Sequence, residues 1–124
     1  MKKWSDALKL ELRRGDVVKV AVSPADAEAG VERHAMVLSP SVINEYSPIV
    51  LVAAVVARKT DRVFPFEAGI EPANGGVTRT SKVLCTQLRS IEKSRIAEVL
   101  GAVDADTLHR VDDALMIAVG LTPI

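Results

Sequence analysis

The chain has 124 residues, of which 48% are hydrophobic and 26% are charged, and both values are typical of a single globular domain. Its 16 basic and 16 acidic side chains give a formal net charge of zero, which argues against a general polyanion binder. Aromatic residues make up only 3% of the chain, so a platform for stacking nucleic-acid bases is not expected.

The cysteine content and the apolar runs bear on where the protein works. A single cysteine, Cys85, excludes an internal disulfide and a cysteine-cluster metal site, and it fits a reducing cytosol. The longest fully apolar run, residues 49–57, is too short to cross a bilayer. No apolar signal-peptide core precedes Leu8. We therefore predict a cytoplasmic protein without a membrane segment.

An apolar spacing of four residues at the N-terminus predicts a short amphipathic helix, with Trp4, Leu8 and Leu12 along one face. A turn signal, Arg-Gly-Asp at residues 14–16, follows directly. We therefore expect residues 1–13 to form an N-terminal extension that precedes the domain proper.

β-Branched and alternating apolar stretches predict strands through the middle of the chain. The stretch at 49–56 is continuously apolar, so we expect a central strand that is buried on both faces. Pro65 favours an edge position for the strand that contains it. The expected strands cover residues 17–22, 33–39, 49–56, 63–67 and 82–88. The expected connections are a polar loop at 24–32, a helical turn within 41–47, a charged loop at 58–62 and a turn at 71–76.

Two helices are expected towards the C-terminus. Ser90 is a candidate N-cap for a helix over residues 91–100, which Gly101 would close. Asp104 is the expected N-cap of a last helix that runs to about Val119 and carries one apolar stripe. Several strands followed by helices predict an α+β fold or a small barrel with a terminal helix.

Charge is distributed unevenly along the chain. Residues 58–95 carry eight basic and four acidic side chains, a net charge of +4. Residues 96–124 carry one basic and five acidic side chains, a net charge of −4. A basic middle followed by an acidic end predicts a local anion site on a neutral body.

Arg33 begins the second expected strand directly after an acidic loop, so its cation should have a fixed position. Three interpretations remain open: an ordinary surface charge, an ion pair with Glu28 or Glu32, and a ligand-binding group. His34 alternates to the opposite strand face, so we do not expect it to pair with Arg33.

Two other groups of polar residues are candidates for contact with an anion, the loop residues Arg58, Lys59 and Arg62 and the strand-end residues Gln87, Arg89 and Ser90. A solvated loop and ordinary helix capping are the alternatives, since orphan amides at a strand-to-helix junction can serve either purpose. His109 lies on the last expected helix and is interpreted as a surface residue. No phosphate-binding loop, dinucleotide fingerprint or Cys/His metal spacing is present, so no metal and no cofactor is expected.

Four short blocks add a family resemblance to this interpretation. They are Arg14 to Val18, Glu28 to Ser39 with Gly30 and Arg33, Thr86 to Ile91, and Val111 to Leu121. In this order and spacing they resemble the MazF/PemK-like (Kid-like) toxins of bacterial type II toxin–antitoxin systems. The resemblance implies that residues 14–124 form one small SH3-like or CcdB-like β-barrel with a C-terminal helix, and that the protein is a homodimer.

The resemblance also implies an activity, the metal-independent cleavage of single-stranded mRNA at a short sequence. In that reaction the ribose 2′-OH attacks the adjacent phosphate and leaves a 2′,3′-cyclic phosphate and a 5′-OH. A cation must stabilise the charged phosphorane, and other groups must move the two protons. By resemblance the catalytic residues are Arg33, Thr86 and Glu28. The substrate-binding residues are Lys19, His34, Arg58, Lys59, Thr60, Gln87, Arg89 and Ser90.

Three positions depart from the family pattern. Val56 replaces a hydroxyl-bearing threonine, Thr86 replaces a carboxylate, and His34 replaces a proline. Candidates for the lost proton transfer are Thr60, Thr86, Ser39 and His34. The alternative interpretation is a non-catalytic interaction module of the same fold, such as a gyrase-directed toxin like CcdB.

A protein partner is implied by either interpretation. Antitoxins of this family lay an acidic, disordered tail over the basic surface near the active site. The region with a net charge of +4, residues 58–95, is the expected target, so binding should weaken as salt is added.

Overall fold

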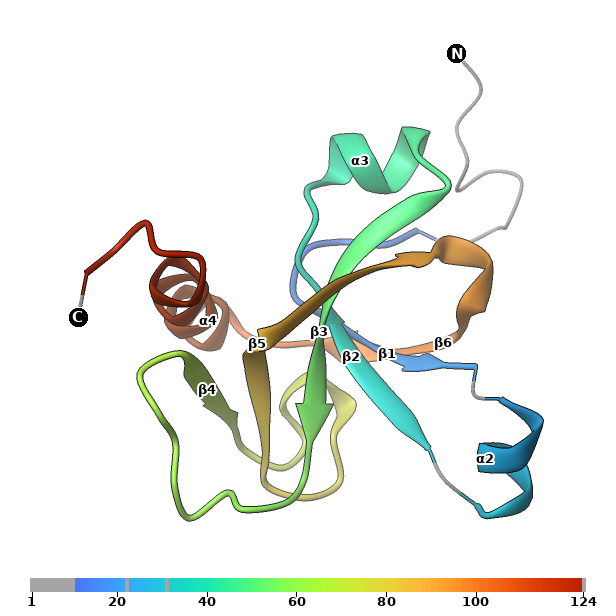
Figure 1. Ribbon diagram of the computed structural model, residues 1–124, viewed down its shortest axis with the longest axis horizontal. Coiled ribbons are helices and arrows are strands. Elements are labelled where there is room, and N and C mark those ends of the chain that lie inside the picture. The colour runs from blue at the N-terminus through green and yellow to red at the C-terminus, as the bar shows by residue number, and fades with distance from the viewer. Residues whose placement is uncertain (1–10, 22, 31, 124) are drawn as a thin grey trace.

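The computed structural model describes residues 11–21, 23–30 and 32–123 and is shown in Figure 1. Its elements in chain order are β1 (Asp16–Val20), α2 (Pro24–Glu28), β2 (Arg33–Val37), α3 (Ser41–Tyr46), β3 (Ile49–Val56), β4 (Glu67–Ile70), the 3-10 turn η1 (Asn74–Gly76), β5 (Ser81–Glu92), the 3-10 turn η2 (Lys93–Arg95), β6 (Ile96–Ala102) and α4 (Ala105–Ala118).

The strands form one antiparallel sheet in the order β4-β5-β3-β2-β1-β6. The predicted α+β fold with a C-terminal helix is confirmed. The sheet curls strongly but does not close into a ring, because β4 and β6 each pair with a single neighbour in the part of the chain that the structure describes (Figure 1).

The alternation of β2 divides the buried side chains into two clusters. Met36 and Leu38 lie in one cluster, which α4 covers with Val111 and Ala114. The neighbouring residues of β2 lie in a second cluster, which joins the first half of β3 to the turn between β5 and β6. Removal of these side chains from water is the main stabilising term, at roughly 25 cal/mol per Å² of apolar surface.

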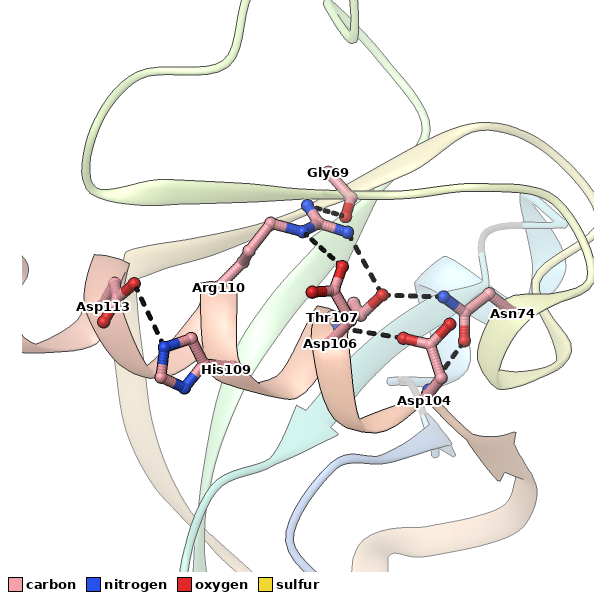
Figure 2. A network of polar contacts seen from close by, with 8 residues as sticks. All are labelled: Gly69, Asn74, Asp104, Asp106, Thr107, His109, Arg110 and Asp113. Carbon is pink, nitrogen blue, oxygen red and sulfur yellow. Dashed lines mark hydrogen bonds and ion pairs between the residues drawn. The ribbon is translucent and has the colours of Figure 1, made fainter.

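Polar contacts fix α4 against the sheet, as Figure 2 shows. Asp104 is its N-cap as predicted, and its carboxylate accepts a hydrogen bond of 2.8 Å from the Thr107 amide. Asn74 in η1 donates to the Thr107 hydroxyl at 2.8 Å and accepts from the Asp104 amide at 2.9 Å. Arg110 reaches across to the Gly69 carbonyl of β4 at 3.1 Å. These bonds join the helix to β4 and η1.

His109 lies on the outer side of α4, where its side chain is 77% exposed and 3.9 Å from Asp113, which confirms the prediction of a surface histidine (Figure 2). Among the described residues, no helix is both long and apolar enough to cross a membrane.

The helix predicted over residues 91–100 is wrong, because this segment forms the end of β5, η2 and β6. Ile91 and Ile96 are buried in the second cluster, and β6 pairs with β1 in the register Val18↔Val99 and Val20↔Ile96. Pairing with a strand far away in the sequence therefore overrides the local helical pattern. It follows that Ser90 caps no helix and that residues 86–91 are not a strand-to-helix junction.

Three smaller expectations also change. The strand predicted at 63–67 begins only at Glu67, because the preceding residues form a loop in which Pro65 cannot donate a ladder hydrogen bond. That strand does lie at an edge of the sheet, as predicted. The loop predicted at 24–32 contains the short helix α2. The first half of β3 is not buried on both faces, since Ile49 and Leu51 are each 38% exposed.

Most of the helix predicted at the N-terminus falls on residues 1–10, which are outside the described residues. Glu11 and Leu12 have no regular secondary structure, and Leu12 is buried in the second cluster.

A buried polar network fixes α3 beside the turn between β5 and β6. The Asn44 side chain donates to the Leu12 carbonyl at 3.2 Å and to the Ser39 carbonyl at 2.9 Å, and it accepts from the Ser39 hydroxyl at 2.6 Å. The ammonium group of Lys93, which is fully buried, donates to the Asn44 carbonyl. Burial lowers the pKa of Lys93, and the Glu45 carboxylate opposes part of that change. Ser39 is therefore engaged in the core.

Candidate functional site

A wide bulge in β5 shapes the candidate site. Ala54 of β3 pairs with Leu84, whereas the preceding Ala53 pairs with Leu88, so residues 85–87 are inserted between two successive pairs. The strand bends sharply at this point (Figure 1). Cys85 stays buried, while the next two residues are exposed. A bulge of this kind re-aims side chains, and here it turns Gln87 towards β2.

Two adjoining hollows lie at this bend. A cleft of about 730 Å³ lies between the start of β2, the end of β3, β6 and the segment after η1. A groove of about 570 Å³ lies between the start of β2, the second half of β5 and η2. Both hollows are lined by Arg33, His34 and Gln87, so these residues stand at the junction of the two.

The structure brings together most of the residues that the sequence singled out. The cleft is lined by Lys19, Arg33, His34, Arg58 and Gln87, and the groove by Arg33, His34, Gln87, Arg89 and Ser90. Val56, which stands where the family carries threonine, lies in the cleft wall and is half-buried. No hydroxyl can reach the cleft from that position.

Four predicted residues line neither hollow. Glu28 is exposed at the end of α2, and Thr86 is exposed in the β5 bulge. Lys59 and Thr60 lie in the loop after β3, where Lys59 has a left-handed backbone with φ of 52°. Thr86 and Lys59 are nevertheless next in sequence to the lining residues Gln87 and Arg58.

Three charged lining residues, Arg79, Arg95 and Glu98, were not singled out from the sequence, and a fourth, Glu32, was considered only as an ion-pair partner of Arg33. Arg95 and Glu98 were hidden because their segment was interpreted as a helix. In the groove, Arg95 lies with Arg33 and Arg89, and none of the described lining residues is acidic. Its guanidinium also donates to the Ala21 carbonyl at 3.2 Å.

Acidic side chains offset part of the charge in the cleft. Lys19 and His34 are directly opposite in the β1–β2 register, and Glu98 is opposite Lys19 on β6. The Glu32 carboxylate lies 3.0 Å from the Lys19 ammonium and 3.7 Å from His34 Nε2. Its hydrogen bond and charge raise the pKa of Lys19, and Lys19 in turn lowers the pKa of Glu32. Among the described residues, the charged side chains that line the groove are therefore all basic, whereas those that line the cleft carry both signs.

The arrangement suits a chain of phosphodiesters better than a single anion. Arg33 is exposed at the junction of the hollows, and an arginine fork can hold two phosphate oxygens at once. Further cations on either side of it supply successive phosphate contacts. Within residues 11–21, 23–30 and 32–123, no group of three His, Cys, Asp or Glu side chains is placed to hold a metal ion.

A family model and a curated relative both match most of the chain. The model of a family described as the PemK-like, MazF-like toxin of type II toxin–antitoxin systems matches residues 13–119. The chain is 32% identical over 111 residues to endoribonuclease EndoA of Bacillus subtilis (strain 168), covering 89% of this chain and 96% of that protein.

Solved structures agree in fold. MazF from Deinococcus radiodurans matches with a TM-score of 0.68 and 33% identity, covering 90% of this chain and 98% of that chain. The MazE–MazF structure from the same organism matches with a TM-score of 0.70 and 29% identity, covering 91% and 99%. A mycobacterial endoribonuclease in complex with its cognate antitoxin has a TM-score of 0.75 at 18% identity, covering 91% and 99%, and supports the fold alone.

Proposed function

The chain belongs to the PemK-like, MazF-like toxin family of type II toxin–antitoxin systems, and from this membership we propose that it is a toxin endoribonuclease that cleaves single-stranded RNA. The observation that carries the proposal is Arg33, which stands where a groove lined by two further arginines meets a cleft lined by charges of both signs. The relative that is 32% identical is named an endoribonuclease, which supports the same activity.

The proposed reaction is transesterification at one phosphodiester. The 2′-oxygen loses its proton and bonds to phosphorus, the bond from phosphorus to the 5′-oxygen breaks, and that oxygen takes up a proton. Arg33 holds the equatorial oxygens of the phosphorane and stabilises their charge. Because the nucleophile is the 2′-OH, RNA is cut and DNA is not.

We assign proton transfer to groups close to Arg33 along the chain or in the bulge. His34 borders both hollows, and an imidazole ring can both accept and donate a proton. Glu28 and Thr86 remain further candidates. Lys19, Arg58, Gln87, Arg89 and Ser90 hold the flanking phosphates and bases, and Lys59 and Thr60 extend this set along the loop.

A cognate antitoxin is the proposed regulator, because the family consists of toxins of toxin–antitoxin systems and a MazE–MazF structure shares the fold. An acidic, disordered tail suits the groove formed by Arg33, Arg89 and Arg95. We also propose that residues 14–124 form the toxin domain after an extension at 1–13, and that the protein acts in the cytoplasm.

We propose a homodimer, and one face of the β3–β5 pair supports it. Leu51 pairs with Ser90, and Leu88 pairs with Ala53, so both leucines project from the same face. Leu51 is 38% exposed and Leu88 is 36% exposed, and Ile49 extends the same apolar strip. A second copy of the chain would cover this strip.

Incubation of the protein with long mixed-sequence RNA in EDTA tests the activity. Wild type should give discrete fragments with 2′,3′-cyclic phosphate ends. Arg33→Ala should lower the rate by about 10²–10³, the typical loss of a group that stabilises an oxyanion. Arg13→Ala is the control, because Arg13 is exposed and lines neither hollow.

Two results would overturn the proposal. Cleavage that is the same in Arg33→Ala and wild type would remove Arg33 from the mechanism. Intact RNA with wild type, together with co-purification of gyrase, would favour the non-catalytic alternative.

A further inference from the structure

The loop between β3 and β4 carries a stack of two aromatic rings. The Phe64 and Phe66 ring centroids are 5.4 Å apart, and their planes differ by 7°. The Arg62 guanidinium lies over the Phe64 ring, 5.7 Å from its centroid. Phe64 is the outer ring, 41% exposed, whereas Phe66 is half-buried. The low aromatic content argued against such a platform, but the fold gathers two of the few aromatic residues at one place.

The platform is held by a buried ion pair. Glu67 Oε1 accepts from the Phe64 amide at 3.1 Å and from the Lys82 ammonium at 2.9 Å. The same ammonium donates to the Arg62 carbonyl at 2.9 Å, so the backbone is fixed on both sides of the ring. The Lys82 and Glu67 side chains are only 6% and 9% exposed. A ring held in place this way loses little conformational entropy when a ligand binds.

The loop leaves directly from the cleft. Val56, Ala57 and Arg58 line the cleft, and the ring stack follows a few residues later in the same loop. The end of β3 lies beside the start of β2, because Val55 pairs with His34. A polyanion held at Arg33 that extends past Arg58 would meet this loop. Exposed Lys59 adds a further positive charge on the way.

We propose that Phe64, backed by Phe66, is a base-stacking subsite for a nucleotide of the RNA on one side of the cleavage point, where the base takes the place of the Arg62 guanidinium over the ring. This inference rests on the proposed function. Every base has a π face, so an exposed ring from which the guanidinium is displaced can accept any base and add affinity without hydrogen-bond readout. The cations hold the phosphates, and the ring sets the position of one base relative to Arg33.

The test measures binding of two fluorescein-labelled strands that cannot be cut. One is an all-2′-deoxy single strand of mixed sequence, and the other has the same phosphates but abasic sugars. Phe64→Leu keeps an apolar side chain without a π face, whereas Phe64→Tyr keeps the π face. Val63→Ala is the matched control, because Val63 is the adjacent residue and is 48% exposed.

Stacking predicts that Phe64→Leu weakens binding of the intact strand by about 5- to 150-fold, the range that loss of one aromatic platform produces. Binding of the abasic strand should not change, and Phe64→Tyr and Val63→Ala should stay within about 2-fold of wild type on both strands. Thermal unfolding of each variant establishes that the fold is retained.

Equal weakening on both strands, or no weakening on the intact strand, would overturn the proposal. If Phe64→Leu weakened binding of an acidic peptide but not of either strand, the ring would belong to a protein-binding surface, and the stacking proposal would also be overturned. The RNA cleavage assay is separate: wild type that fails to cut RNA would refute the proposed endoribonuclease, while the two strands still report on stacking.

Discussion

The substitution Lys82→Met is expected to destabilise the fold, because it leaves the carboxylate of Glu67 unpaired beside the loop that carries Phe64. Lys82 is 5% exposed and makes two hydrogen bonds of 2.9 Å, to the Glu67 carboxylate and to the Arg62 carbonyl. Methionine fills a similar volume but donates neither bond. The Glu67 carboxylate, which is 9% exposed, then loses its counter-ion, and the Arg62 carbonyl loses its donor.

The magnitude follows from these two losses. The charge-assisted bond to Glu67 contributes roughly 1.5–3 kcal/mol, and the bond to the Arg62 carbonyl contributes roughly 0.5–1.5 kcal/mol. Their sum agrees with the roughly 3–5 kcal/mol lost when one partner of a buried pair is removed. For a domain of this size the melting temperature should fall by roughly 10–20 °C.

The loss should depend on pH. Burial by itself raises the pKa of the Glu67 carboxyl, but hydrogen bonds from Lys82 and the Phe64 amide, with the charge of Lys82, hold it below its ordinary value. A depressed folded-state pKa stabilises the fold above the ordinary pKa of glutamate, and that stability is lost as the pH falls through the folded value. Without Lys82 burial dominates, so the carboxyl of the variant should protonate at higher pH.

Thermal unfolding followed by circular dichroism from pH 7 to pH 4 checks this reasoning. The difference in melting temperature between wild type and Lys82→Met should be largest at pH 7 and should shrink towards pH 4. Lys19→Met is the control, because the pair of Lys19 with Glu32 is exposed and contributes little. A difference as small as that of the control, or one that does not change with pH, would refute the argument.

Three further predictions follow from the geometry. Glu32→Gln removes the carboxylate that neutralises Lys19, so RNA binding measured by fluorescence anisotropy should tighten at low salt and converge with wild type at high salt. Gly76→Ala should destabilise the fold by more than about 2 kcal/mol in urea unfolding, because φ is +81° and a Cβ would overlap the carbonyl of Leu100. Gly30→Ala, with φ of +73° but open space around the Cβ, should cost much less. Burial, aided by nearby carboxylates, raises the pKa of Cys85 to about 11, so iodoacetamide at pH 8 should label the native protein slowly and the urea-unfolded protein quickly. Rapid labelling of native protein would contradict that burial.

The first three strands and the last helix could be predicted from the sequence, because their signals are local. Alternation at residues 33–38 separates the two buried clusters and places Arg33 and His34 on opposite faces. The continuous apolar run became β3, and Asp104 caps α4 as its position suggested. Arg33 could be singled out as a candidate because it begins a strand directly after an acidic loop.

The second half of the site could not be predicted from local pattern. Residues 91–100 have a helical spacing of apolar side chains, yet Ile91 pairs with β3, the residues from Ile96 onward pair with β1, and both isoleucines are buried. The bulge at 85–87 is a shift in the register between β3 and β5, so it cannot be recognised from the sequence of either strand alone. Arg95 and Gln87 reach the surroundings of Arg33 through these two features.

The sequence by itself determined which segments alternate, which residues cap α4 and which cation begins β2, since each of these depends on neighbours a few residues away. Only the tertiary structure decided what surrounds that cation. It brought Gln87, Arg89 and Arg95 beside Arg33 and stacked Phe64 on Phe66 over a buried ion pair. The physical reason is that strand register and burial of charge depend on contacts between residues far apart in the chain, which composition and periodicity do not encode.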